Sequence, residues 1–402
     1  MTQSIARPAL VLGLLSSIGP FAIDMYLPAM PGIGQDLGAG AQTMQGTITA
    51  YFVAFGLAQM IYGPWADQAG RKLPLYAGIG IFVLGTLWCI FATSGNDLLA
   101  GRFIQGLGGA ALGVVPRAIV RDMATGPEAT RIMAAIMLVF SVSPMLAPLV
   151  GSALLAVTGW RGIFVALLGT ALASLAVLAF GQPETLAPQN RRPFRMATLL
   201  TGCGALLRDR GFMLLTFIGA FGFGSFFIFL AAAPFVYQQG FGLSATQFSL
   251  AFAVNAMAFI GATQAASWVS WRFGVLPALK WASVGFALAT CGLLGLALVS
   301  DVGLVACMTG LALGNFCLGL IVPTTMVLAL DDQGEKAGLA SSLGGTLQML
   351  TGGVMVVALG PVLGSDPLPM IAGVAFSALM ALILTLLVRP QAAGGSAAGR
   401  AA

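Results

Sequence analysis

The sequence is dominated by apolar runs of about twenty residues, which is the length that an α-helix needs to cross a bilayer. Only 8% of the 402 residues are charged and 58% are hydrophobic, whereas about a quarter of the residues of a soluble domain are charged. Such a chain cannot cover a water-facing surface of its size, so we predict a multi-pass membrane protein. Lipid admits only helices and closed barrels, and barrel strands alternate over about ten residues. The predicted fold class is therefore all-α.

We predict twelve spans, separated by mostly short loops. They are 8–31, 43–64, 74–93, 98–119, 130–156, 161–181, 211–235, 246–270, 276–298, 301–329, 336–361 and 367–388. The predicted parts of the chain are an N-terminal six-helix half at 1–181, a central cytoplasmic loop at 182–210, a C-terminal six-helix half at 211–390 and a disordered tail at 391–402. Two halves of six helices indicate a parallel internal repeat.

Basic residues predict the orientation, because cytoplasmic loops carry an excess of Lys and Arg. With the N-terminus inside, the cytoplasmic loops receive most of the 18 basic residues, including the arginines of the central loop, whereas the outer loops keep Arg161. We therefore predict that both termini are cytoplasmic. The net charge of +5 then belongs to these loops, and no nucleic-acid partner is expected.

The absence of histidine from the sequence excludes Ser-His catalysis, HExxH zinc chemistry and haem ligation by histidine. The five cysteines are scattered without a CxxC pair, a spacing that argues against a metal cluster or a disulfide framework. The glycine run at 106–109 lies inside an apolar helical stretch, so it indicates close helix packing rather than a nucleotide loop. We expect no cofactor, no metal and no enzymatic activity.

The first predicted span carries one acidic residue, Asp24, in apolar or small surroundings. A carboxylate at membrane depth is costly and usually functional. It can face the bundle interior, pair with a cation or take a proton. Pro28 and Pro31 should break the helix near its far end and free backbone carbonyls that need partners inside the protein. The isolation of Asp24 predicts that it binds and releases a proton.

The fourth predicted span contains a cation, Arg102, near its outer end. Arg102, Gln105, Gly106 and Gly109 share one helix face, because they are spaced at i, i+3, i+4 and i+7. The glycines on that face would let another helix come close. At a rise of about 1.5 Å per residue, Arg102 and Asp24 lie at similar heights, so the two side chains could approach each other. The alternative is that Arg102 snorkels to the outer headgroups.

The loop after the second span contains Gly63, Asp67, Gly70, Arg71 and Lys72, which form a tight cytoplasmic turn. The simplest interpretation is ordinary basic flanking of a span. The spacing G-x-x-x-D-x-x-G-R-[RK] also resembles the cytoplasmic loop motif of the major facilitator superfamily, in which the Asp braces the inner gate between the two halves. We expect Asp67 to lie at the positive N-terminus of the eleventh helix.

Further motifs occur in order along residues 10–185. They are Asp24-Met25-Tyr26-Leu27-Pro28, Gly63-Pro64 with Asp67, Arg102 with Gln105-Gly106, Arg117-Ala118-Ile119-Val120-Arg121-Asp122, Pro144 with Ala147-Pro148 and Gly151, Gly159-Trp160-Arg161, and Pro183-Glu184-Thr185. The set resembles the Bcr/CflA group of drug exporters, which includes chloramphenicol and bicyclomycin resistance proteins. The resemblance thins in the second half, where 231–235 and 338–342 still fit.

The resemblance implies twelve helices and drug:proton antiport. It implies that Asp24 is the protonation site and that Arg102 couples proton to drug. Some relatives carry a second acid about two turns before this Asp, where the present chain has Ser16 and Ser17.

The resemblance also implies a gating role for the turn at 63–72, for Arg121, and for the fifth-helix motif with Pro144, Pro148 and Gly151. That motif is usually richer in glycine, and a simple proline bend is the alternative interpretation.

A drug pocket between the halves should be apolar with a few polar groups. The candidate residues are Tyr26, Tyr51, Gln105, Phe226, Phe227, Tyr237, Asn255, Asn315 and Gln348. For the aromatic residues the competing interpretation is packing in the core or against lipid. The amides of the second half should lie inside the protein, where their role can also be structural.

The predicted function is proton-driven efflux of small hydrophobic drugs across the inner membrane by alternating access, with drug, protons and the bilayer as partners and a monomer as the working unit. The first alternative is a proton-coupled importer of a small nutrient, which would need more hydrogen-bonding side chains in its spans. The second is a non-transporting membrane scaffold, which has no need of two charges at matching depth.

Overall fold

The structure is a computed structural model that describes residues 6–124, 126–191, 193 and 195–388. Every regular element in these ranges is helical, so the predicted all-α class is confirmed. The tail predicted at 391–402 lies outside the described residues.

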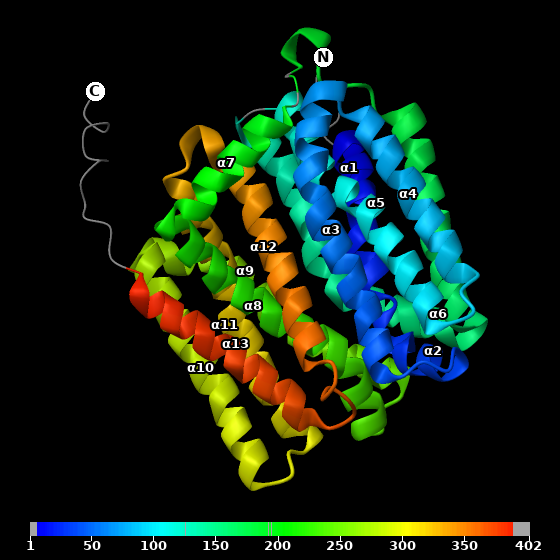
Figure 1. Cartoon of the computed structure of the whole chain (residues 1–402), viewed down its shortest axis with the longest axis vertical. Helices are drawn as coiled ribbons and strands as arrows, with labels where there is room; N and C mark the ends of the chain where they lie inside the picture. The colour runs from blue at the N-terminus through cyan, green and yellow to red at the C-terminus, as the bar shows by residue number, and fades with distance from the viewer. Residues whose placement is uncertain (1–5, 125, 192, 194, 389–402) are drawn as a thin grey trace.

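The helices of the first half begin the chain in Figure 1. They are α1 (Ala6–Asp24), the 3₁₀ turn η1 (Leu27–Ala29), α2 (Met30–Asp36), α3 (Ala41–Ala69), α4 (Lys72–Ile90), α5 (Gly95–Met123) and α6 (Gly126–Gly181).

The remaining elements complete the chain. They are η2 (Pro188–Asn190), α7 (Met196–Arg208), α8 (Arg210–Phe235), the π-helical turn η3 (Val236–Gly240), α9 (Ala245–Phe273), α10 (Val275–Val299), α11 (Leu304–Asp331), η4 (Gly334–Lys336), α12 (Ala337–Leu359) and α13 (Pro367–Leu387).

Ten helices of the described chain are long and apolar enough to cross a membrane. The 29-residue helix α3 is not among them, because it carries several polar residues that face other helices. The long helix α6 contains a break at Gly159, whose φ of 71° is a left-handed conformation that favours glycine. With α3 included and α6 divided at Gly159, the helices are consistent with the twelve predicted spans.

The first predicted span is not one helix. Instead of continuing to residue 31, α1 ends at Asp24, and η1 and α2 follow with Pro28 and Pro31 in their first turns. Proline has no N–H to donate to the preceding turn, so a continuous helix cannot form here. The predicted break is confirmed, but it begins at Asp24 itself. The carbonyls in the last turn of α1 therefore need donors from other helices.

The two halves meet mainly along α3 with α12 and along α6 with α9, and α3 and α12 lie side by side in Figure 1. Small residues let α3 and α12 come close, since a Cβ on Gly56 would lie 2.8 Å from Met349. Hydrogen bonds cross the same seam, from Thr346 to the carbonyl of Gly56 at 2.7 Å and from Gln59 to Thr346 at 3.3 Å.

The central segment 182–210 was predicted as a loop, but it contains the helix α7. Cys203 and Leu206 of α7 are buried in a small core with residues of α8, α11 and α12. Helix α7 therefore packs on the second half, so the connecting segment is partly helical.

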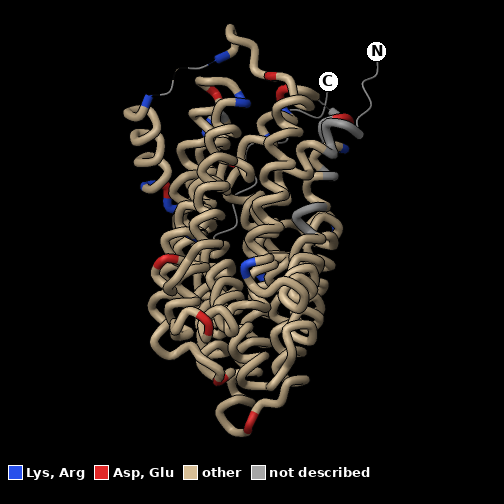
Figure 2. The backbone as a smooth tube through the Cα atoms, turned by 90° about the vertical axis from the view of Figure 1, so that its right-hand side faces the viewer, with Lys and Arg blue, Asp and Glu red and all other residues tan. Residues whose placement is uncertain are grey.

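Charged residues are distributed unevenly along the bundle. Figure 2 shows most Lys and Arg residues towards one end, where acidic residues also lie, whereas the charged residues near the other end are mainly acidic. This distribution is consistent with the predicted orientation.

Candidate functional site

The carboxyl group of Asp24 is buried where α1 ends, with 5% of the residue exposed. No ion pair found among the described residues involves Asp24. A buried acid without a cation or a hydrogen-bond donor is unfavourable when charged. The position is therefore suited to a group that takes a proton or exchanges partners.

Arg102 of α5 is completely buried, with 0% exposed. Its Nη1 donates to the carbonyl oxygen of Ala22 at 2.9 Å and to Oε1 of Gln105. The guanidinium carbon also lies 4.9 Å from the ring centroid of Tyr26 and 4.7 Å from that of Tyr51. The alternative that Arg102 snorkels to the outer headgroups is therefore wrong.

The Ala22 carbonyl is available to Arg102 because the break at Asp24 removes the next helical turn. Arg102 thus binds the chain two residues before Asp24 and forms no ion pair with the acid. Gln105, which holds the same guanidinium, donates from its amide to Thr86 at 2.9 Å. Three helices, α1, α4 and α5, therefore fix the cation.

Several polar atoms at this site are buried and have no hydrogen-bond partner among the residues that the structure describes. They are Nε and Nη2 of Arg102 itself and the hydroxyl of Tyr51. Buried donors are normally satisfied, so this group can accept another polar atom without first breaking an existing bond.

The glycine face predicted on the fourth span is confirmed. A Cβ on Gly106 would lie 2.3 Å from the carbonyl oxygen of Tyr51, and one on Gly109 would lie 2.5 Å from its hydroxyl. Both glycines are therefore needed for α3 to bring Tyr51 against Arg102.

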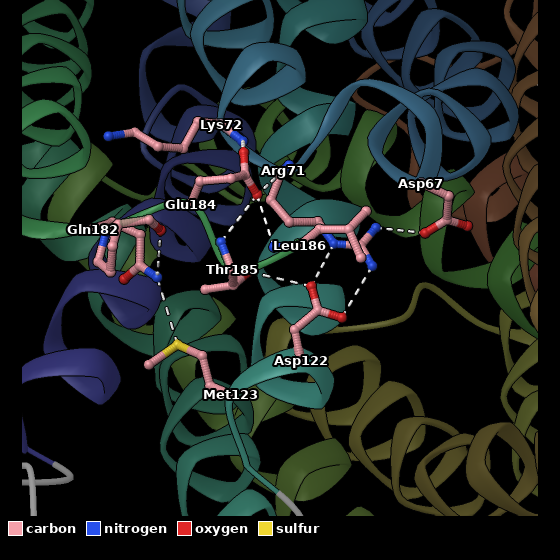
Figure 3. A network of polar contacts seen from close by, with 10 residues as sticks. Asp67, Arg71, Lys72, Asp122, Met123, Gln182, Glu184, Thr185 and Leu186 are labelled. Carbon is pink, nitrogen blue, oxygen red and sulfur yellow. Dashed lines mark hydrogen bonds and ion pairs between the residues drawn. The ribbon is translucent and has the colours of Figure 1, made fainter. Parts of the chain in front are cut away.

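A second polar network lies at the end of α3 and the start of α4 (Figure 3). The guanidinium of Arg71, a residue that is 5% exposed, donates from Nε to Asp122 at 2.7 Å and from Nη2 to the same carboxylate at 3.1 Å. Its Nη1 binds Asp67. The side chain of Asp67 is 51% exposed and that of Asp122 is 16% exposed. Asp122 closes the motif at 117–122 but was not predicted as a gating residue, and it is the better-shielded partner of Arg71.

Asp67 was expected to lie at the N-terminus of the eleventh predicted span, which is α12 in the structure. That contact is not among the hydrogen bonds and ion pairs found in the described chain. Asp67 instead binds Arg71 within its own half. Lys72 places its ammonium 5.6 Å from the ring centroid of Tyr76. Gly70 has a φ of 93°, which explains why glycine occupies this turn.

The other gating candidates have no hydrogen bond or ion pair with this network among the described residues. Arg121 is exposed and Gly63 is half-buried. The carbonyl of Pro148 in α6 accepts a hydrogen bond from Ser249 of α9 at 2.9 Å. The motif of the fifth predicted span, which lies in the first part of α6, therefore contacts the opposite half. A Cβ on Gly151 would lie 2.1 Å from the carbonyl oxygen of Met25, whereas Pro144 lies half-buried within α6.

The candidate drug-contacting residues divide between the two halves. Tyr26, Tyr51 and Gln105 surround Arg102. Phe227 of α8 stacks on Phe52 of α3, with centroids 3.9 Å apart and planes at 13°. Phe52 was not predicted, and this stack is an aromatic contact between the halves.

The remaining candidates pack within the second half. Tyr237 is buried among aromatic rings, and Phe226 stacks on Phe259. Asn315 donates to Asn255 at 3.4 Å. Gln348 lies against Gly219. The structure thus does not bring all nine candidates together at one place.

The motif Gly159-Trp160-Arg161 joins three elements at the opposite end from Arg71. Trp160 donates to Asp36 at 2.8 Å and Arg161 donates to the same carboxylate at 3.2 Å. Both hydrogen bonds, with that of Trp160 the larger cause, hold the pKa of Asp36 below its ordinary value. Arg161 also binds the carbonyls of Ile90 and Ala92 at 3.1 Å each.

Comparison with known proteins identifies related sequences. The model of the Major Facilitator Superfamily matches residues 12–356. An uncharacterized MFS-type transporter YdgK of Bacillus subtilis is 35% identical over 353 residues, covering 86% of this chain and 87% of that protein. A bicyclomycin resistance protein homolog of Haemophilus influenzae is 30% identical over 86% of this chain and 87% of that protein. A chloramphenicol resistance protein of Pseudomonas aeruginosa is 31% identical over 86% of this chain and 82% of that protein.

The fold is also similar to solved structures. The xylose transporter XylE from E. coli, in a partially occluded inward-open conformation, superposes with a TM-score of 0.71 at 15% identity. The match covers 96% of this chain and 98% of XylE. At this identity the likeness concerns the fold alone.

Proposed function

The chain belongs to the Major Facilitator Superfamily, and we propose that it exports small hydrophobic drugs across the inner membrane in exchange for protons. Membership of a superfamily of transporters confirms the prediction that the protein is not an enzyme. Relatives named as bicyclomycin and chloramphenicol resistance proteins support a drug as the exported substrate. We propose that the monomer is the working unit.

The observation that carries the proposal is that a buried acid, which has no ion-pair partner in the described chain, lies near a buried cation that has unused hydrogen-bond donors. Asp24 has no ion-pair partner among the described residues, and Arg102 keeps Nε and Nη2 unbonded while Nη1 binds Ala22. An ionised Asp24 attracts the guanidinium, and a protonated Asp24 does not. The proton therefore changes the balance between two arrangements of Arg102.

The rearrangement reaches the rest of the molecule through α1. Arg102 is bonded to the last turn of α1, and the segment after the break contacts the second half, where Gln238 donates to the carbonyl of Pro28 at 3.1 Å. A shift of α1 at Asp24 thus acts on a contact between the halves. This connection supports alternating access by movement of one half against the other.

A proton-coupled importer of a polar nutrient is the alternative, and it would require free hydrogen-bonding groups between the halves. In the described chain, Asn255 and Asn315 are bonded to each other, and Thr346 and Gln59 are bonded across the seam. These bonds reduce the number of groups that a polar nutrient could bind, and the relatives named as resistance proteins favour the exporter.

The test is a resistance panel in an efflux-deficient bacterial host, combined with inverted membrane vesicles that are acidified inside. Expression should raise resistance to one or more uncharged drugs of the chloramphenicol or bicyclomycin type, and adding that drug should release protons from the vesicles. Resistance that persists after a protonophore collapses the proton gradient would contradict the proposal. Movement of the drug into intact cells in place of export would contradict it as well.

A further inference from the structure

Helix α4 starts without a side-chain cap from its own sequence. Its N-cap residue is Arg71, whose side chain makes no capping hydrogen bond. The first N–H groups of a helix have no partner within the helix and need one from elsewhere. Here that partner comes from a residue more than a hundred positions later in the chain.

Glu184, which follows α6, supplies both missing acceptors (Figure 3). Its Oε1 accepts from the backbone N–H of Arg71 at 2.9 Å, and its Oε2 accepts from that of Lys72 at 3.1 Å. Oε1 also accepts from the backbone N–H groups of Thr185 and Leu186, at 3.0 Å each. A carboxylate is favoured at this position, because a helix N-terminus is electropositive.

The backbone at Gly70 is shaped for this carboxylate. Gly70 has a φ of 93°, and a Cβ at this position would lie 2.6 Å from Oε2 of Glu184. Any other residue would therefore be strained and would push the carboxylate away from α4. The contact between Glu184 and α4 therefore depends on glycine at position 70.

The same contacts fix Arg71 at both ends. Glu184 holds its backbone, while Asp122 binds its guanidinium with two hydrogen bonds. Thr185 connects the two acids, because its hydroxyl donates to Asp122 at 3.2 Å. The orientation of Arg71, and with it the position of Asp67, depends on the segment 184–186.

We propose that Glu184 is a positioning residue of the inner gate: it closes the N-terminus of α4, holds the turn at 70–72 and ties the start of the central segment to the first half. The proposal rests on the alternating access proposed above. It predicts that the turn loses its fixed geometry when Glu184 can no longer accept two N–H groups, although Arg71, Asp67 and Asp122 are all still present.

The first experiment compares Glu184→Gln with Glu128→Gln by amide hydrogen exchange in detergent micelles. Glu128 is an exposed acid in the first turn of α6, so it controls for loss of charge at this end of the bundle. In Glu184→Gln one acceptor becomes a donor that faces a donor. Amide exchange at 71–73 should then become about tenfold faster, as expected for a lost hydrogen bond. Glu128→Gln should leave that segment unchanged.

The second experiment separates positioning from simple stabilisation. Spin labels at Leu73 and Lys336, introduced after the five native cysteines are replaced by alanine, report the distance between the halves at this end. Glu184→Gln should shift the distance distribution, and Gly70→Ala, which keeps the glutamate but displaces it, should give the same shift.

The outcomes are distinguishable from failure of the transport proposal, because neither measurement needs a drug or a proton gradient. Unchanged amide exchange at 71–73 in both Glu184→Gln and Gly70→Ala would overturn the proposal that Glu184 holds the turn at 70–72. Faster exchange with an unchanged distance distribution would overturn the positioning role and leave only a local cap.

Discussion

Arg102 donates a 2.9 Å hydrogen bond to the carbonyl of Ala22, although the acidic side chain of Asp24 lies only two residues further along α1. The cation therefore binds the end of a broken helix and not the acid beside it. Two of its nitrogen atoms have no hydrogen-bond partner within the described part of the chain. This arrangement lets the protonation of Asp24 change the attraction of the guanidinium with little loss of existing bonds.

Asp24→Asn should abolish uphill drug export, because the amide cannot carry the coupling proton. Downhill drug exchange and membrane insertion should persist, since asparagine has nearly the same volume. The measurement is drug-induced proton release in proteoliposomes, with Asp301→Asn in an exposed loop as the control. Uphill export by a well-folded Asp24→Asn protein would remove Asp24 from the mechanism.

Arg102→Lys should impair coupling even though the charge is kept. Lysine offers a point charge and not a planar fork, so it cannot bind Gln105 and the Ala22 carbonyl while lying against two tyrosine rings. A desolvated cation–π contact contributes about 1–2 kcal/mol, and two are weakened here. Drug binding should lose its dependence on pH in Arg102→Lys, whereas Arg272→Lys at an exposed site should behave like the parent. The same pH dependence in both variants would count against Arg102.

Transport should exchange one proton for each drug molecule. Asp24 is the buried acid of the first half, and Ser16 and Ser17 occupy the place where some relatives carry a second acid. With one proton, an uncharged drug moves one net charge inward, and the membrane potential assists by about 2.3 kcal/mol per 100 mV. A dication would be opposed by the same amount. Proteoliposomes with a clamped potential measure this ratio, and two protons per neutral drug would mean that a second titrating group exists.

Asp122→Asn should destabilise the protein more than Asp67→Asn does. Asp122 accepts two hydrogen bonds from Arg71 and has a shielded side chain, so its loss should cost about 1–3 kcal/mol. Asp67 is half exposed, and exposed ion pairs contribute about 0–1 kcal/mol. Thermal unfolding in detergent compares the two variants, and an equal or reversed order would refute this assignment of the stronger bond.

The hydrogen bonds between Glu184 and the start of α4 should withstand mild acidification. Partial burial acts to raise the pKa of Glu184, but backbone N–H donors, including that of Arg71, outweigh it, so the pKa lies below its ordinary value of 4.5. A carboxylate with a depressed pKa contributes stability above its unfolded pKa and loses it as the pH falls through the folded value. Protection of the amides at 71–73, corrected for intrinsic exchange rates, should therefore stay constant from pH 8 to about pH 5. A loss of protection near pH 6 would contradict this assignment.

The fold was largely predictable, because long apolar runs leave few choices in a bilayer. The burial of Asp24 and Arg102 followed from their depth along predicted spans. The partner of Arg102 did not follow, since it depends on the exact residue at which α1 ends. The sequence placed the prolines of the first span at 28 and 31, but the helix already ends at residue 24.

The polar networks were only partly predictable for a different reason. Arg71 meets Asp122 and Glu184 across 51 and 113 residues of sequence, and helical periodicity carries no information over such separations. The Phe52–Phe227 stack is likewise a contact between distant helices. Helix α7 was missed because prolines and arginines around it resemble an ordinary loop.

The contacts of Glu184 and of α7 together set a limit on how far the halves can separate at this end. The first contact ties the segment ending at Leu186 to α4, and the second anchors α7 from Met196 onward to α8, α11 and α12. Only the stretch 187–195 connects the two anchors, and a fully extended chain of that length reaches about 30 Å. A larger separation of the halves at this end requires that either the contacts of Glu184 or the packing of α7 break first. Deleting residues from this stretch should therefore restrict the inner opening while both sets of contacts stay intact.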